Sequence, residues 1–194
     1  MFPYGDDNYE IVPINFNFTY FHYFFDTLTI DTNGFIYFSG KKCCDIALRS
    51  DSNAISGLNY DLNTASEGEI VYENVYSNSS DFGLIKSDIN RLNSAFVPTN
   101  VFRITYYNVP DYFEKINYAS FQVILASDSS KNYVALKYYS CLSGLSLLSS
   151  PGLNYLNQSG HNFSIKIENP CGSSNVNLTG TWVFDVSLPS SEGF

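Results

Sequence analysis

Hydrophobic and polar positions alternate along much of this 194-residue chain. Alternation with a period of two is typical of strands with one buried face. Residues 16–25 (FNFTYFHYFF) alternate and then become apolar, which predicts a strand that becomes buried on both faces. Residues 31–34 (DTNG) follow as a turn, because Asn and Gly tolerate positive φ. With a further strand at 35–38, this is the clearest hairpin in the chain.

Short strands separated by turns continue to the end of the sequence. Clusters of Ser, Asp, Pro and Gly divide the chain at intervals that suit an antiparallel fold. Between them we predict strands at residues 46–48, 69–73, 101–109, 119–126, 133–139, 163–167 and 181–186. Their number and spacing favour a β-sandwich or a barrel-like sheet.

One segment has the period of a helix instead. Apolar residues recur in it at steps of three and four: Phe82, Ile85, Ile89, Leu92 and Phe96. Ser80 or Asp81 is placed to cap its N-terminus, and Pro98 bars its continuation. We therefore predict a helix over about residues 81–95, packed on a sheet by this stripe.

The domain organisation follows from what is absent. No repeat or linker divides the sequence, so the expected fold is a single, mainly β, antiparallel domain over residues 1–194 with one packed helix. No apolar run is long enough to span a membrane, and Met1 is not followed by a signal peptide. We expect a piece of a larger protein that is secreted or forms an ectodomain, with a cytosolic chain as the alternative.

The composition mainly excludes classes of partner. Charged residues make up 15% of the chain, the formal net charge is -9 and the pI is about 4.4. An acidic surface repels phosphate backbones and anionic lipids, which argues against nucleic acid and against docking on anionic lipid, and the lack of a long apolar run argues against direct membrane insertion. The same charge is compatible with solubility, basic partners or calcium.

The four cysteines bear on the compartment. Cys43, Cys44, Cys141 and Cys171 form an even number without the C-x-x-C spacing of zinc sites, so two disulfides are expected. A vicinal bond between Cys43 and Cys44 would strain the peptide between them. We therefore rank long-range pairings of these two with Cys141 and Cys171 above it, and a Cys141–Cys171 bond stays open.

N-x-S/T sequons, which are acceptors for N-glycans in secreted proteins, occur at five positions. They are Asn17, Asn78, Asn157, Asn162 and Asn177. A chain this rich in Asn and Ser would contain about four by chance. The sequons therefore permit an extracellular location without establishing it.

Catalytic and metal-binding patterns are sparse. The chain has two histidines and no nucleophile elbow, H-E-x-x-H or phosphate loop, so an enzyme is not expected. A carboxylate pair of a glycoside hydrolase would come from Asp61, Glu67, Glu69 and Glu73. The residues Asp61, Asn63 and Glu67 offer oxygen ligands for calcium in one polar loop, although hydrogen bonding to their own turns is the simpler reading.

Ordered motifs along the chain resemble the NIDO domain, the extracellular module of nidogen and of tectorin-type and mucin-type proteins. The most specific is residues 120–128 (SFQVILASD), and others are residues 2–5 (FPYG), 32–38 (TNGFIYF) and 180–184 (GTWVF). Tyr60 and Tyr106 stand where the family has Trp. The resemblance implies a non-catalytic module of matrix or cell-adhesion proteins.

Tyrosines in loop-like positions are the candidates for contact with a partner, because tyrosine combines a large contact area with a polar tip. We select Tyr60, Tyr112 and Tyr155, and Tyr4 and Tyr9 share this setting. The predicted function is binding of extracellular or matrix proteins. The alternatives are a calcium-dependent or glycan-binding module and, behind these, a glycoside hydrolase.

Overall fold

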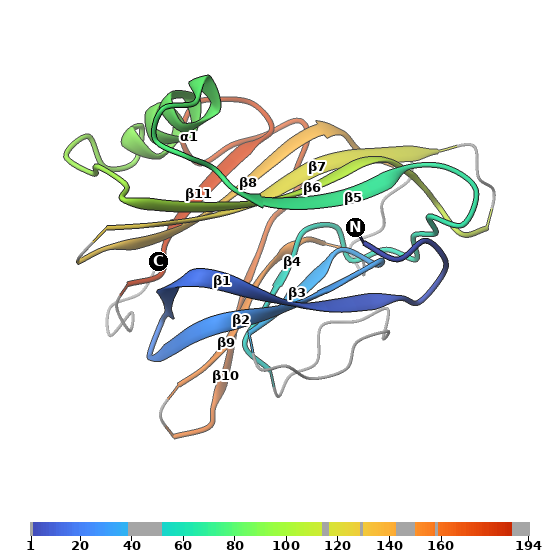
Figure 1. The fold of residues 1–194 in the computed structure, drawn as a ribbon, viewed down its shortest axis with the longest axis horizontal. Helices are drawn as coiled ribbons and strands as arrows, with labels where there is room; N and C mark the ends of the chain where they lie inside the picture. The colour runs from blue at the N-terminus through green and yellow to red at the C-terminus, as the bar shows by residue number, and fades with distance from the viewer. Residues whose placement is uncertain are drawn as a thin grey trace.

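Two antiparallel β-sheets pack face to face as a sandwich, with one helix on the outer face of the second sheet (Figure 1). The structure, a computed structural model, describes residues 2–38, 52–113, 117–128, 130–142, 150–157 and 159–187. The sheets do not close into a barrel, so of the two predicted arrangements the sandwich is confirmed.

The first sheet has six strands in the order β1-β2-β3-β4-β9-β10. They are β1 (Tyr9–Tyr20), β2 (Tyr23–Asp31), β3 (Phe35–Tyr37), β4 (Ala54–Ser56), β9 (Gly152–Leu156) and β10 (Asn162–Lys166). The predicted hairpin around residues 31–34 is confirmed, because β2 and β3 pair antiparallel across it.

The second sheet has five strands in the order β11-β8-β7-β6-β5. They are β5 (Glu69–Asn74), β6 (Asn100–Pro110), β7 (Tyr118–Ser127), β8 (Asn132–Ser140) and β11 (Thr181–Asp185). All five match predicted strands to within one residue at each end.

Buried tyrosines join the two sheets through the core. Tyr106 of β6 stacks on Phe121 of β7, with 4.4 Å between ring centroids, and its hydroxyl donates to the carbonyl of Asp31, 2.6 Å away in the first sheet. The Tyr138 hydroxyl likewise donates to the Gly57 carbonyl at 2.7 Å. Burial raises the pKa of both tyrosines. Each buried hydroxyl has an acceptor, so its hydrogen bond offsets the cost of removing the group from water.

The helix α1 (Ser80–Asn90) covers the outer face of the second sheet (Figure 1). Phe82, Ile85 and Ile89 are buried there in a cluster with side chains of the sheet, which confirms the first three residues of the predicted stripe. The Lys137 ammonium lies 2.6 Å from the Asp88 carboxylate and ties β8 to the helix. In the described part of the chain no helix is long and apolar enough to cross a membrane.

The predicted bounds of the helix were wrong. The helix ends at Asn90 rather than near residue 95, and Leu92 beyond it is 45% exposed. Its cap is Ser79, whose hydroxyl accepts the backbone N–H of Phe82, and neither of the two residues predicted for that role. Phe96 is buried as expected, but it packs against the sheet from the turn after the helix rather than from the helix itself.

The single strand predicted over residues 16–25 was also wrong. The chain turns sharply between Tyr20 and Tyr23, which face each other as the last pair of the β1–β2 hairpin. Phe21 lies at the turn with φ of 54° and 2% exposure, its ring stacked at 3.7 Å on that of Tyr155. Burial of this ring explains why an aromatic residue holds a backbone conformation usually left to Asn or Gly.

A disulfide joins Cys141 to Cys171, 30 residues apart. This corrects our ranking, which placed pairings of these two with Cys43 and Cys44 first. Cys43 and Cys44, and the strand predicted at 46–48, lie outside the described residues.

Candidate interaction surface

The end of the sandwich beside the N-terminal segment is built from loops and the adjoining strand ends of β6 and β7, which hold one another. We call residues 2–8, 59–68, 107–113 and 117–118 the loop end. Gly5 and Thr64 exchange hydrogen bonds, with each backbone N–H donating to an oxygen of the other residue at 3.0 Å. The Tyr112 N–H donates to the Asp61 carbonyl at 2.9 Å, which ties the β6–β7 connection to the same loop. The loop end is therefore fixed to the sandwich by backbone contacts.

A β-bulge in β6 shapes the centre of this region. The pairing of β6 with β7 shifts register between Tyr106 and Val109, and Asn108 adopts a φ of 46° within the bulge. Gly68 packs directly against it, since a Cβ atom there would lie 2.5 Å from the Asn108 carbonyl oxygen. Bulges commonly re-aim side chains at functional surfaces. Here the bulge leaves both Tyr107 and Asn108 exposed.

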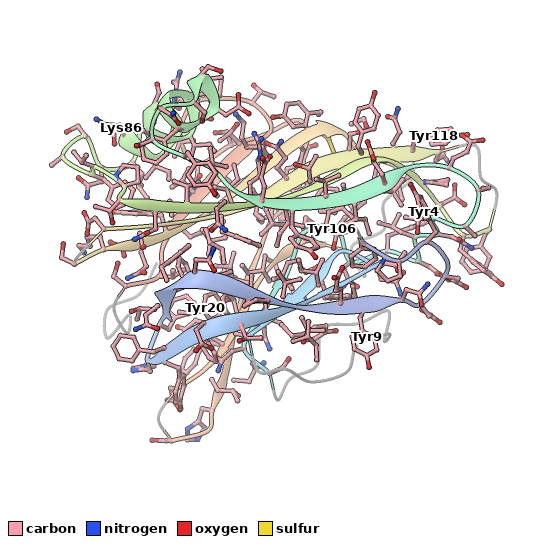
Figure 2. All side chains as sticks on the ribbon, in the orientation of Figure 1. Tyr4, Tyr9, Tyr20, Lys86, Tyr106 and Tyr118 are labelled. Carbon is pink, nitrogen blue, oxygen red and sulfur yellow. A yellow bond between two sulfur atoms is a disulfide. The ribbon has the colours of Figure 1, made fainter. Side chains whose placement is uncertain are left out.

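Three tyrosines and two glutamates surround a pocket of about 440 Å³ over the bulge. Its walls are Tyr4, Tyr107, Tyr118, Glu67 and Glu69, and Gly68 and Asn108 complete the lining. Figure 2 shows Tyr4 and Tyr118 at the same end of the molecule, away from Lys86 on the helix. Glu69 lies directly opposite Tyr107 in the β5–β6 ladder, so their side chains are neighbours on one face. A hydrogen bond to the Glu67 carboxylate raises the pKa of Tyr118.

Acidic side chains dominate the loop end. Its described segments, with the adjoining Glu69, contain no Lys or Arg and six carboxylates: Asp6, Asp7, Asp61, Glu67, Glu69 and Asp111. Residues 114–116, between those segments, add one Glu and one Lys in sequence and so no net charge. The carboxylates interact, because burial and the charges of Asp6, Asp7 and Asp111 together raise the pKa of Asp61. The described segments of the loop end therefore carry negative charge without a cationic side chain of their own.

The three residues predicted to bind calcium have separate roles among the described contacts. The Asn63 side-chain oxygen accepts the Ala65 N–H at 2.7 Å, as expected for a turn residue. Glu67 accepts the hydroxyl of Tyr118, and Asp61 lies among the other aspartates. Within the described ranges, no group of three or more His, Cys, Asp or Glu is placed to hold a metal ion.

The tyrosines selected from the sequence differ in exposure. Tyr112 is 42% exposed on the loop end, beside Phe113 at 73%. Tyr60 is half-buried against the core. Tyr155 is not in a loop and is only 5% exposed, because it belongs to β9 and its ring stacks between those of Phe21 and Phe163. Tyr155 is therefore withdrawn as a contact residue.

Most of the sequon asparagines lie where a glycan could project into solvent. Four of the five are exposed: Asn17, Asn78, Asn162 and Asn177. Asn157 is half-buried, and its side-chain oxygen accepts the N–H groups of Ser159 and His161. Glycosylation at these positions stays a prediction.

Two walls of the pocket, Tyr107 and Tyr118, were missed by sequence reasoning. Tyr107 was counted as a strand residue, Tyr118 lay just before a predicted strand, and strand periodicity does not reveal a bulge. The carboxylates considered for a hydrolase are divided in the structure. Glu67 and Glu69 line the pocket, whereas Glu73 forms an ion pair with Arg103.

A family model for the nidogen-like domain matches residues 26–188 of the chain. The matched range runs from within β2 through β11, and so includes most of both sheets and the helix. No match was found among curated proteins or among solved structures. Of the motifs quoted from the sequence, residues 32–38, 120–128 and 180–184 lie within this range, and residues 2–5 precede it. The chain therefore belongs to the nidogen-like (NIDO) domain family.

Proposed function

We propose that this domain binds an extracellular protein through the loop end and has no catalytic role. The observation that carries the proposal is a group of exposed aromatic side chains on a fixed loop framework. They are Tyr4 (56% exposed), Tyr107 (55%), Tyr112 (42%) and Phe113 (73%). Large apolar side chains gathered on a surface mark contact sites more often than scattered ones do.

The scaffold supports this use of the surface. Loops held by a rigid sandwich present side chains without a large ordering cost on binding, and aromatic anchors supply most of the energy of many interfaces. The nidogen-like family consists of extracellular modules that are generally non-catalytic. The Cys141–Cys171 disulfide fits secretion. Binding to a matrix or cell-adhesion protein is the specific role that we propose.

Capture from an extracellular matrix extract tests the proposal. We expect the domain to retain a partner that is lost when Tyr112→Ser and Phe113→Ser are combined, because the aromatic anchors are then removed. The control combines Tyr76→Ser and Leu84→Ser, which are 73% and 62% exposed near the helix. Equal capture by both double variants would show that the loop end is not the contact surface.

The alternatives from the sequence give different results in the same preparation. A calcium-dependent binder would melt at a higher temperature with calcium than with chelator, since a ligand bound only by the native state raises Tm. A glycan-binding module would lose its partner after enzymatic deglycosylation of the extract. The first result would favour the calcium-dependent binder and the second the glycan-binding module, in each case over direct protein binding.

A further inference from the structure

The pocket over the β6 bulge has the chemistry of a site for a cation. We infer that it binds an arginine side chain of the partner protein, held between tyrosine rings and glutamate carboxylates. This inference rests on the proposed function, since it names the group that the partner presents. The occupant is identified by charge complementarity and by the shape of the lining.

Three of the seven described lining residues are tyrosines. A guanidinium group is attracted to the face of an aromatic ring, with about 0.5–1 kcal/mol at exposed sites and more when water is excluded. Tyr4 and Tyr107 are each more than half exposed, so their rings are accessible to an incoming side chain. The pocket volume of about 440 Å³ lies in the range of ordinary ligand sites.

Two carboxylates supply the opposite charge. Glu67 and Glu69 are exposed at the pocket, and none of its described lining residues is a Lys or Arg. Glu67 already accepts a hydrogen bond from Tyr118, which fixes that side of the pocket. Glu69 has a tyrosine rather than a cation directly across the ladder, in contrast to Glu73, whose cross-strand partner is Arg103.

Arginine fits this lining better than lysine does. Its planar guanidinium can stack on a tyrosine ring and, at the same time, donate two parallel hydrogen bonds to a carboxylate. A lysine ammonium is a strongly hydrated point charge that gains less from a flat ring. The surrounding aspartates of the loop end also raise the local concentration of cationic segments.

Binding of small probes tests the inference without the partner. The probes are the N-acetyl N-methylamides of arginine, of lysine and of citrulline, which is nearly isosteric with arginine but uncharged. We expect arginine to shift the amide NMR signals of Gly68 and Asn108 at millimolar concentrations and citrulline to bind at least about fivefold more weakly. Equal binding of arginine and citrulline, or tighter binding of lysine, would overturn the inference.

Two variants and two matched controls locate the site. Glu69→Gln and Tyr107→Leu should each weaken arginine binding severalfold, whereas Glu168→Gln and Tyr76→Leu, at exposed positions outside the pocket lining, should not. Arginine binding that survives both pocket variants would contradict the assignment. The two proposals fail separately. If the arginine probe binds but no partner is captured, the arginine site is supported and the proposed function is overturned. If a partner is captured but the probes show no preference for arginine, the proposed function is supported and the arginine site is overturned.

Discussion

At the scale of single residues, Gly68 decides whether the loop end can take its shape. Its φ of 77° belongs to the left-handed region, and an added Cβ would lie 2.5 Å from the Asn108 carbonyl oxygen and 2.8 Å from the Val109 Cα. Both neighbours are backbone atoms of the bulge and cannot rotate away. We therefore expect Gly68→Ala to lower the free energy of unfolding by about 3 kcal/mol, measured by urea denaturation.

Gly160 provides the matched control for this prediction. It has nearly the same φ, 78°, but a Cβ there would meet nothing within 4 Å. Gly160→Ala should therefore cost only the conformational penalty of about 1 kcal/mol. If the two variants lose the same stability, the close approach of Gly68 to the bulge contributes nothing.

At the scale of elements, two ion pairs connect the helix to the sheet, Asp81 with Arg103 of β6 and Asp88 with Lys137 of β8, and the second is the more buried. The carboxylate of Asp88 is 11% exposed and lies 2.6 Å from the Lys137 ammonium of β8. Replacing Lys137 with Met leaves this carboxylate poorly solvated and without its cation. We expect Lys137→Met to reduce the free energy of unfolding by about 2 kcal/mol, measured by chemical denaturation.

Adding Asp88→Asn to Lys137→Met should restore part of that loss, because the uncompensated charge is then removed. Lys86→Met is the control on α1, since Lys86 forms no ion pair with a described residue. Purely additive losses in the double variant would show that the two groups do not interact.

An element could be predicted from the sequence where local residue patterns determine it, and not where contacts between distant residues do. The strands of the second sheet were predictable because alternation and turn residues agree there. The β1–β2 turn was not, since Phe21 carries no turn signal. It is held by contacts with residues far apart in sequence, the ring of Tyr155 and the backbone carbonyl of Val186. The short strands β4 and β9 are held by pairing with their neighbours, and three to five residues give too few positions for a periodic pattern.

The candidate site was predictable only in part, for a related reason. Its loop residues Tyr4 and Glu67 were considered because polar and aromatic residues in loops suggest binding. Tyr107 and Tyr118 sit in strands whose register is broken by the bulge, so alternation alone gives no indication that their side chains reach one pocket.

At the scale of the whole molecule, the formal net charge of -9 is concentrated partly at the loop end. Asp61 shows the consequence for stability. Its pKa in the folded protein is raised above 3.8 by burial and by repulsion from Asp6, Asp7 and Asp111. Between the ordinary and the raised pKa, the folded state binds more protons than the unfolded state does. The free energy of unfolding therefore falls as pH rises through this interval, and the cost of ionising Asp61 is complete above it.

Removing this charge should stabilise the protein. Asp61→Asn keeps the shape of the side chain, so we expect a gain of less than about 1 kcal/mol at pH 7, determined by urea denaturation. The gain should shrink as pH falls through the raised pKa and vanish below 3.8, where Asp61 is protonated in both states.

Glu168→Gln, at an exposed position outside the loop end, changes the net charge by the same amount and should give a smaller gain. An equal gain from Glu168→Gln would assign the effect to net charge rather than to the acidic loop end. If the repulsion is local, the same carboxylates that destabilise the free domain are available to attract a basic partner.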